Sequence, residues 1–347
     1  MLIISITSSL SFAQNAKSKK GSRVQKVKVE TPVAPKREVE DNSSDSMSFN
    51  NARENIDLMY ISNIGDRVIT GTMTYGTTKT SIYRSGALLS DVNSKSTSAD
   101  FEGYYGITEN SYVGISSGYK INNDTENTYG PAAGSLSGQT ITLSSDGLED
   151  VTLKYKIRLL HQQSSRVNFN IGIDYSPKLM DHKGATSTSR GDVARGGDLT
   201  TLSAEIGNKY NLLAYSGVLT YSIPGTRSSE YSDGSSDSST GGNALSLQAN
   251  LQYTGLPRFT PRFGIATISY ASTSTQSSTG TTTTINDLSA LGFNFTGIWT
   301  VIQNQFYLAG SYSRIIISGA NGVGGSTLLK VDDQILNTYT ITALMNF

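Results

Sequence analysis

The feature that most restricts the fold of this chain is an alternation of apolar and polar residues that recurs along most of its length. In EDVTLKYKIRLLH, residues 149–161, apolar side chains occupy every second position from Val151 to Leu159, with threonine, lysine or arginine between them. Only an extended strand places alternate residues on opposite faces. Residues 166–176 repeat the alternation after a short polar linker, so the two segments predict neighbouring antiparallel strands.

Segments of this kind predict an all-β fold with about twelve strands. The composition agrees, because 34 glycines, 19 tyrosines and only 16% charged residues suit strands joined by turns. One strand is expected within residues 67–84. The others are expected at 99–108, 111–121, 149–160, 166–176, 199–208, 211–223, 244–254, 259–271, 287–300, 304–317 and 335–347.

The connections between these strands alternate between short and long. Residues 108–110 and 207–210 are short connections, whereas 122–147 and 224–243 are long and rich in Ser, Thr and Gly. A soluble β-sandwich has no reason to keep every second connection long, but membrane-spanning β-barrels have short turns at one end and long loops at the other. The sequence therefore predicts an antiparallel transmembrane β-barrel with short periplasmic turns and long, flexible extracellular loops.

The chain ends in TYTITALMNF, in which apolar residues alternate up to a terminal aromatic residue. This ending resembles the C-terminal β-signal of bacterial outer-membrane β-barrel proteins, a porin-like class. The resemblance implies a place in the outer membrane of a Gram-negative bacterium, contact with outer-membrane lipid, and insertion by the barrel assembly machinery through the last strand. The signal residues it implies are Tyr339, Ile341, Ala343, Met345 and Phe347.

The parity of the strands is consistent with this class. Bacterial single-chain barrels have an even number of strands with both ends in the periplasm. Twelve strands satisfy the rule, whereas a hairpin within residues 67–84 would make thirteen and place the preceding residues outside the cell. The last strand is then expected to close the barrel against the first.

The N-terminal 65 residues differ in composition from the rest. Residues 1–13 are interpreted as a signal peptide, because a short apolar run precedes small residues at Ser11 and Ala13. Residues 14–65 combine a run of lysines with prolines and few apolar residues, which predicts a flexible periplasmic arm. The basic run suits an anionic partner such as cell-wall polymer, and a solvated tether is the alternative. The barrel is expected to occupy residues 66–347.

If the apolar faces of the strands contact lipid, the polar faces line the lumen. Asp174 is then expected opposite Lys154, and Asp100 and Glu102 are expected to be opposed by Lys120. Such charges bias ion passage in an open pore, or fill a closed barrel as pairs. The predicted pore-lining residues are Lys154, Lys156, Arg158, Arg166, Asp174, Asp100, Glu102, Lys120 and Glu205.

Barrel size leaves two functions open. Side chains fill an eight-stranded barrel, a sixteen-stranded barrel encloses a channel, and twelve strands lie between. The first hypothesis is a narrow passive diffusion pore for small hydrophilic solutes or ions. The alternative is a structural or surface-interaction outer-membrane barrel with a closed lumen.

Few residues offer chemistry for an enzyme. The chain has no cysteine and two histidines, His161 in a predicted short turn and His182 in a predicted long loop. Asp181 followed by His182 is similar to an element of outer-membrane proteases, but the companion acidic pair is not identifiable, so a hydrolase is a remote alternative and no catalytic residue is predicted. Asp233 and Asp237 lack the glutamate of an EF-type calcium loop. No metal or cofactor is predicted, and the equal numbers of basic and acidic residues, 28 each, do not indicate nucleic acid.

Overall fold

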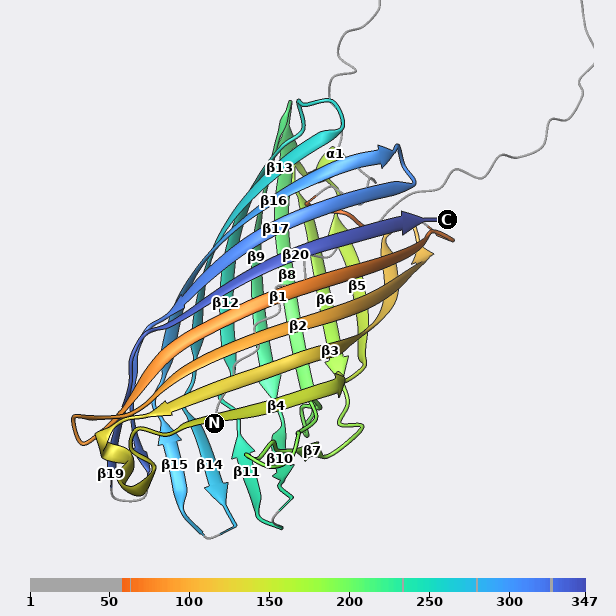
Figure 1. The fold of residues 1–347 in the computed structure, drawn as a ribbon. Helices are drawn as coiled ribbons and strands as arrows, with labels where there is room; N and C mark the ends of the chain where they lie inside the picture. The colour runs from red at the N-terminus through yellow and green to blue at the C-terminus, as the bar shows by residue number, and fades with distance from the viewer. Residues whose placement is uncertain (1–57, 63, 233, 279, 325–326) are drawn as a thin grey trace, which may run out of the picture.

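The computed structural model describes residues 58–62, 64–232, 234–278, 280–324 and 327–347 (Figure 1). Its wall is a closed antiparallel β-barrel of twelve strands, which confirms the predicted fold class and strand number. Residues 67–84 form one strand, as expected. The wall strands, in order around the barrel, are β1 (Arg67–Arg84), β2 (Ala87–Thr108), β3 (Ser111–Tyr129), β5 (Thr152–Leu160), β6 (Asn168–Ser176), β8 (Leu199–Tyr210), β9 (Leu213–Pro224), β12 (Ala244–Tyr253), β13 (Phe259–Tyr270), β16 (Leu288–Ile302), β17 (Phe306–Ile317) and β20 (Gln334–Asn346).

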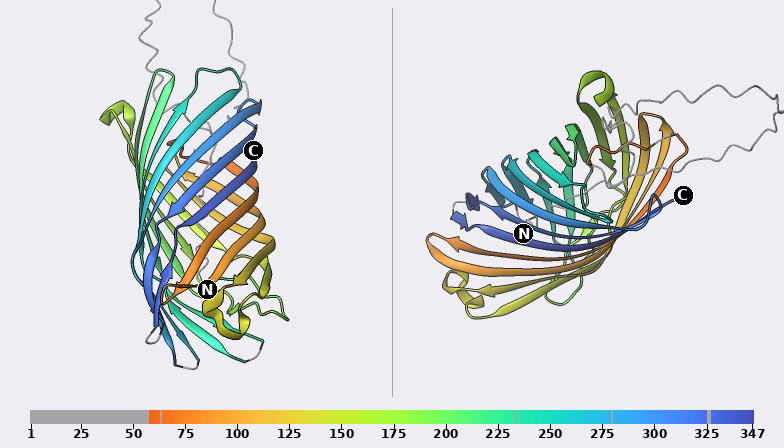
Figure 2. Two further views of the ribbon diagram at one scale, coloured as in Figure 1. Left: turned by 60° about the vertical axis from the view of Figure 1, so that its left-hand side comes forward. Right: turned by 90° about the horizontal axis from the view of Figure 1, so that it is seen from above.

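The barrel closes where the last strand meets the first. Strand β20 pairs with β17 on one side and with β1 on the other, and Figure 2 shows these tilted strands side by side. In this seam Thr72 lies opposite Thr342, with 3.0 Å between their hydroxyl oxygens, and Thr74 lies opposite Thr340. The expected closing role of the last strand is therefore confirmed.

A belt of exposed apolar side chains surrounds the outer surface of the wall. Phe101 is 62% exposed and Ile341 is 69% exposed, and both occupy alternate, outward-facing positions. The rings of Tyr75 and Tyr312 lie 6.4 and 5.1 Å from that of Tyr339, so three neighbouring strands carry a row of tyrosines at the edge of the belt. Apolar belts bounded by aromatic residues face lipid in transmembrane barrels. The outward positions of β20, among them Tyr339, belong to this belt, and so does Phe347, which follows the strand.

Short connections lie at one end of the barrel and long ones at the other. The α1 helix (Gln162–Ser165) lies in a short connection, and the 3-10 helix η2 (Pro131–Leu136) lies in a long one. No helix in the described part of the chain is long and apolar enough to cross a membrane. We refer to the two ends as the short-turn end, where the C-terminus lies in Figure 1, and the long-loop end.

The long loops are built largely from paired strands, which we call the crown. Strands β10, β11, β14, β15, β18 and β19 pair in that order, and β19 pairs with β1 (Figure 1). The expectation of flexible loops is wrong for these segments, because their backbone groups find partners in the neighbouring hairpin despite the lack of apolar alternation. The crown strands are β10 (Thr226–Glu230), β11 (Ser236–Thr240), β14 (Thr273–Ser277), β15 (Thr282–Ile285), β18 (Ala320–Gly324) and β19 (Thr327–Val331). Two further strands of the long loops are β4 (Thr140–Leu148) and β7 (His182–Lys183).

The N-terminal residues that the structure describes lie inside the barrel. Residues 1–57, with the predicted signal peptide and most of the predicted arm, are outside the described residues. Met59 is 0% exposed and Ile61 is 3% exposed. The assignment of residues 58–62 to a flexible arm is therefore wrong. Their sequence, LMYIS, is mostly apolar, and the barrel offers it a buried environment.

The interior is filled at the short-turn end. There, every wall strand contributes at least one inward-facing residue that is buried. Residues from β1, β2, β3, β16, β17 and β20 form one apolar cluster. We call this region the filled end. One buried residue from each strand in turn is Val68, Tyr104, Tyr112, Arg158, Asn168, Gly207, Ala214, Gln252, Thr260, Thr296, Tyr307 and Leu344.

Candidate functional site

Residues 58–62 cross the interior of the filled end, and we call them the plug. Met59 packs with Ala214 of β9, whereas Tyr60 and Ile61 join the cluster around the β1–β20 seam. The plug therefore touches opposite parts of the wall. Sequence reasoning missed this element, whose only mark in the sequence is the short apolar run LMYI, residues 58–61, five residues before the first strand.

Polar contacts hold the backbone of the plug. Arg158 of β5 donates a hydrogen bond from Nη2 to the carbonyl oxygen of Met59, and its Nε donates to Oδ1 of Asn170 at 3.1 Å. Gly207 of β8 allows the close approach, because a Cβ at that position would lie 2.7 Å from Cγ of Met59. The hydroxyl of Tyr60 donates to Oδ2 of Asp66 at 3.4 Å. The plug is thus fixed by apolar packing and by a charge-assisted hydrogen bond.

Between the filled end and the crown, charged side chains from β2 to β8 form pairs across the strands. Lys154 bonds Glu102, and Nζ of Lys156 lies 2.6 Å from Oε1 of Glu205. Nζ of Lys120 lies 3.1 Å from Oε1 of Glu149. Glu205 also accepts a hydrogen bond from the amide of the Asn170 side chain at 3.1 Å. This half of the wall therefore presents opposite charges in mutual contact.

The expected partner of Lys154 is confirmed in the strand register, whereas that of Lys120 is confirmed only in part. Asp174 lies directly opposite Lys154 in the β5–β6 register, as expected. The expectation that Lys120 opposes Asp100 and Glu102 is met only for Asp100, with which Lys120 interacts electrostatically. Glu102 bonds Lys154 instead, and Lys120 bonds Glu149, a residue that sequence reasoning did not consider. Strand pairing determines which backbone positions are neighbours, but a lysine side chain is long enough to contact a carboxylate two strands away.

Arg166 is the predicted pore-lining residue that lies off the wall. It follows α1 with φ of 63°, in the left-handed conformation that ends a helix, and its side chain is exposed. Its assignment to the lumen is wrong because the strand begins only at Asn168. The other predicted residues occupy inward-facing positions of the wall: Asp100, Glu102, Lys120, Lys154, Lys156, Arg158, Asp174 and Glu205.

Hydroxyl and amide side chains line the opposite half of the wall. Asn250 donates from Nδ2 to Oγ of Ser216 at 3.2 Å, and Gln248 donates from Nε2 to Oδ1 of Asn250 at 2.7 Å. The threonines of the seam continue this surface across β20 and β1. The lumen between the filled end and the crown therefore has a charged half and a neutral half, and the neutral half is polar except for a buried apolar cluster of Ile268, Ala290, Ile315 and Ile317 toward the crown.

The two histidines lie at opposite ends of the barrel. His161 precedes α1 at the short-turn end. His182 lies on β7, and its Nδ1 is 2.9 Å from Oδ1 of Asp192. The described residues include no group of three or more His, Cys, Asp or Glu side chains that could hold a metal ion.

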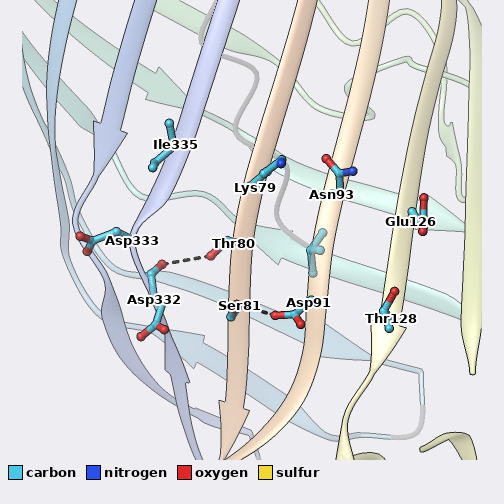
Figure 3. A pocket seen from close by; sticks show the side chains of 11 residues that line it. Lys79, Thr80, Ser81, Asp91, Asn93, Glu126, Thr128, Asp332, Asp333 and Ile335 are labelled. Carbon is cyan, nitrogen blue, oxygen red and sulfur yellow. Dashed lines mark hydrogen bonds between the residues drawn. The ribbon is translucent and has the colours of Figure 1, made fainter. Parts of the chain in front are cut away.

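A groove of about 670 Å³ lies on the outer face of the wall, not in the lumen (Figure 3). Lys79, Asn93 and Glu126 form a row across β1, β2 and β3, and Ser81 donates to Oδ1 of Asp91 at 2.5 Å beside it. The row continues the outward-facing positions of the apolar belt toward the crown. The groove is therefore separate from the charged half of the lumen.

Comparison with known proteins identifies the fold but no family. No protein-family model and no curated protein matches the sequence. An outer-membrane channel from Pseudomonas putida F1 aligns with a TM-score of 0.51 and 12% identity, covering 82% of this chain and 96% of that chain. This chain has the fold of an outer-membrane β-barrel.

Two further structures of outer-membrane β-barrels align less closely with this barrel. A deltaS2 mutant of the TodX monoaromatic hydrocarbon channel has a TM-score of 0.43 and 12% identity over 84% of this chain and 92% of that chain. The outer-membrane protease OmpT from Escherichia coli has a TM-score of 0.36 and 8% identity over 81% of this chain and 96% of that chain.

Proposed function

We propose that this protein is an outer-membrane channel for small hydrophilic solutes or ions, and that the plug closes its periplasmic end. The short-turn end is placed in the periplasm and the crown outside the cell, following the rule for bacterial barrels. The apolar belt contacts the lipid. We assign no catalytic role to the chain.

The observation that carries the proposal is the difference between the two parts of the interior. Between the plug and the crown, most of the wall presents polar side chains, which suit water and hydrophilic solutes. The exception is an apolar cluster of Ile268, Ile315 and Ile317 at the long-loop end of the wall. At the filled end, the interior is completed by five residues, Leu58 to Ser62, that belong to no strand. Wall side chains alone fill a barrel of eight strands, whereas a wider barrel leaves space that something else must occupy. Because the plug lies outside the sheet, its release costs no wall hydrogen bond between strands.

The proposed orientation of the barrel in the membrane also bears on two proposed partners, cell-wall polymer and the barrel assembly machinery. Strand β1 begins and β20 ends at the short-turn end, so residues 14–57 are proposed to start from the periplasmic side, where a basic run meets cell-wall polymer. The exposed, outward-facing residues at the end of β20 suit recognition by the barrel assembly machinery. Both assignments rest on the sidedness proposed above.

A surface-interaction barrel with a closed lumen is the second candidate. The crown favours it, because paired hairpins of Ser and Thr extend the sheet well past the apolar belt and present a defined surface. In that case the plug would be a permanent part of the core.

Conductance in planar bilayers distinguishes the two candidates. The full chain is compared with a variant that lacks residues 58–62, both shown to be folded by heat-modifiable gel mobility. The channel proposal expects rare openings from the full chain and a sustained current from the variant. A folded variant that carries no current would refute the channel and leave the closed barrel.

A further inference from the structure

Three charged residues from separate segments meet at the long-loop end of the barrel. Asp150 lies between β4 and β5, Arg195 lies in the connection between β7 and β8, and Arg227 lies on β10. The backbone N–H of Arg195 donates to Oδ2 of Asp150 at 2.7 Å, and Nε of Arg227 donates to the carbonyl oxygen of Arg195 at 2.7 Å. These two bonds link the three residues into one cluster.

Close backbone packing holds the cluster in place. Ala194 is 1% exposed, and the backbone N–H of Ser228 donates to the carbonyl oxygen of Gly196 at 3.0 Å. Gly196 has φ of 71°, and a Cβ there would lie 2.4 Å from the carbonyl oxygen of Ser228. Only glycine therefore lets β10 approach this connection so closely. The charged groups are positioned before any ligand arrives.

The cluster leaves two buried polar atoms without partners. Asp150 is 8% exposed, and its Oδ1 has no hydrogen-bond partner among the described residues. Nη1 of Arg195 is likewise buried and has no partner in the described part of the chain. Buried polar atoms are normally hydrogen-bonded, because desolvation without a partner costs free energy. One unused donor and one unused acceptor in the same cluster indicate a missing polar occupant.

The charge balance indicates what kind of occupant the cluster suits. Burial lowers the pKa of Arg227, the nearby guanidinium of Arg195 lowers it further, and Asp150 acts in the opposite direction. Two guanidinium groups and one carboxylate leave one net positive charge. A single carboxylate neutralises that charge, whereas a phosphate dianion would exceed it. Guanidinium groups also match the planar geometry of a carboxylate.

We propose that Arg195, Arg227 and Asp150 form a binding site for a small hydroxycarboxylate. The two arginines hold its carboxylate, and Oδ1 of Asp150 accepts a hydrogen bond from its hydroxyl group. The site lies at the long-loop end of the barrel, and the plug lies at the short-turn end. A role of this site as the entry of a channel rests on the proposed function. Binding of a hydroxycarboxylate does not depend on it.

Isothermal titration calorimetry of the refolded full chain in detergent tests the site, with lactate as the probe. Arg195→Ala and Arg227→Ala are each expected to weaken lactate binding at least about tenfold, as is usual when one member of a desolvated charge pair is removed. Arg190→Ala is the matched control, because Arg190 lies in the same connection, is exposed, and has its Nε 2.9 Å from Oδ1 of Asp146. It is expected to leave lactate binding unchanged.

Two further comparisons keep the test independent of folding defects. Asp150→Asn raises the net charge of the cluster, so it is expected to shift the preference from lactate toward inorganic phosphate. Propionate, which lacks the hydroxyl, is expected to bind the wild-type chain more weakly than lactate. The proposal is overturned if the folded wild-type chain does not bind lactate, if it prefers phosphate, or if Arg190→Ala weakens binding as much as Arg195→Ala. A chain that binds lactate but never conducts would refute the channel alone.

Discussion

Replacing Ile61 with alanine tests how firmly the plug is held. Ile61 is 3% exposed and packs in the apolar cluster that joins the plug to the seam. Shortening a buried isoleucine to alanine costs about 2 to 5 kcal/mol in a packed core. The cost applies to the plugged state, because a released plug has no such packing to lose. Since about 1.4 kcal/mol is tenfold in an equilibrium constant, the ratio of plugged to released barrels should fall by about 30-fold to a few thousandfold.

The assay is the open probability of single channels in a planar bilayer. Ile61→Ala is expected to raise the open probability by the same factor, about 30-fold to a few thousandfold, until the channel is open all the time. Ile64→Ala is the matched control, because Ile64 is 65% exposed and lies only three positions further along the chain. The reasoning would be refuted if folded Ile61→Ala opened no more often than wild type, or if both variants opened equally often.

The remaining predictions address the lumen, the plug contact and assembly. Arg158→Lys keeps the positive charge but replaces the two nitrogens that bond Met59 and Asn170 with a single ammonium group, so open probability should rise. A hydrogen bond to a charged group is worth about 1.5 to 3 kcal/mol. An unchanged open probability would mean that the bond to Met59 does not hold the plug. In the chain without the plug, Lys156→Glu places a second carboxylate beside Glu205, and the reversal potential in a salt gradient should shift toward cation preference. No shift would show that Lys156 does not face the ion path. Removing Phe347, which is 58% exposed, should lower the heat-modifiable fraction recovered from cells more than the fraction refolded in detergent, and equal losses would argue against a recognition role.

The wall could be predicted from the sequence because its two faces meet different surroundings. Leu153 and Tyr155 are exposed on the outer surface while Lys154 and Lys156 face the interior, so the alternation in the sequence reflects both faces of each strand. The same alternation continues to Phe347, which is why the closing strand was recognisable.

Contacts inside the barrel were less predictable. Register places Asp174 opposite Lys154, yet the lysine bonds Glu102 two strands away, because a long side chain selects its partner in three dimensions. Arg166 continued the pattern of polar positions but lies in a turn that needs the left-handed conformation.

The plug and the crown could not be predicted for different reasons. Met59 to Ile61 form too short a run to show a period, and their burial depends on a lumen that exists only after twelve strands have closed. Four crown strands, β10, β11, β14 and β15, carry Ser or Thr on both faces, so nothing in their pattern predicts a strand, and contacts with neighbouring hairpins determine their pairing.

The seam between β1 and β20 also sets the order of events when the protein is made. Thr72 and Thr342, which bond across it, are 270 positions apart, so the first strand has to wait for nearly the whole chain to be synthesised. Contacts between such distant positions form slowly, since a long loop has to close before they contribute. During that delay the first strand keeps a free edge that can pair with another chain. A product truncated before residue 334 would keep its free edges permanently, so premature termination should yield aggregates and not a smaller barrel.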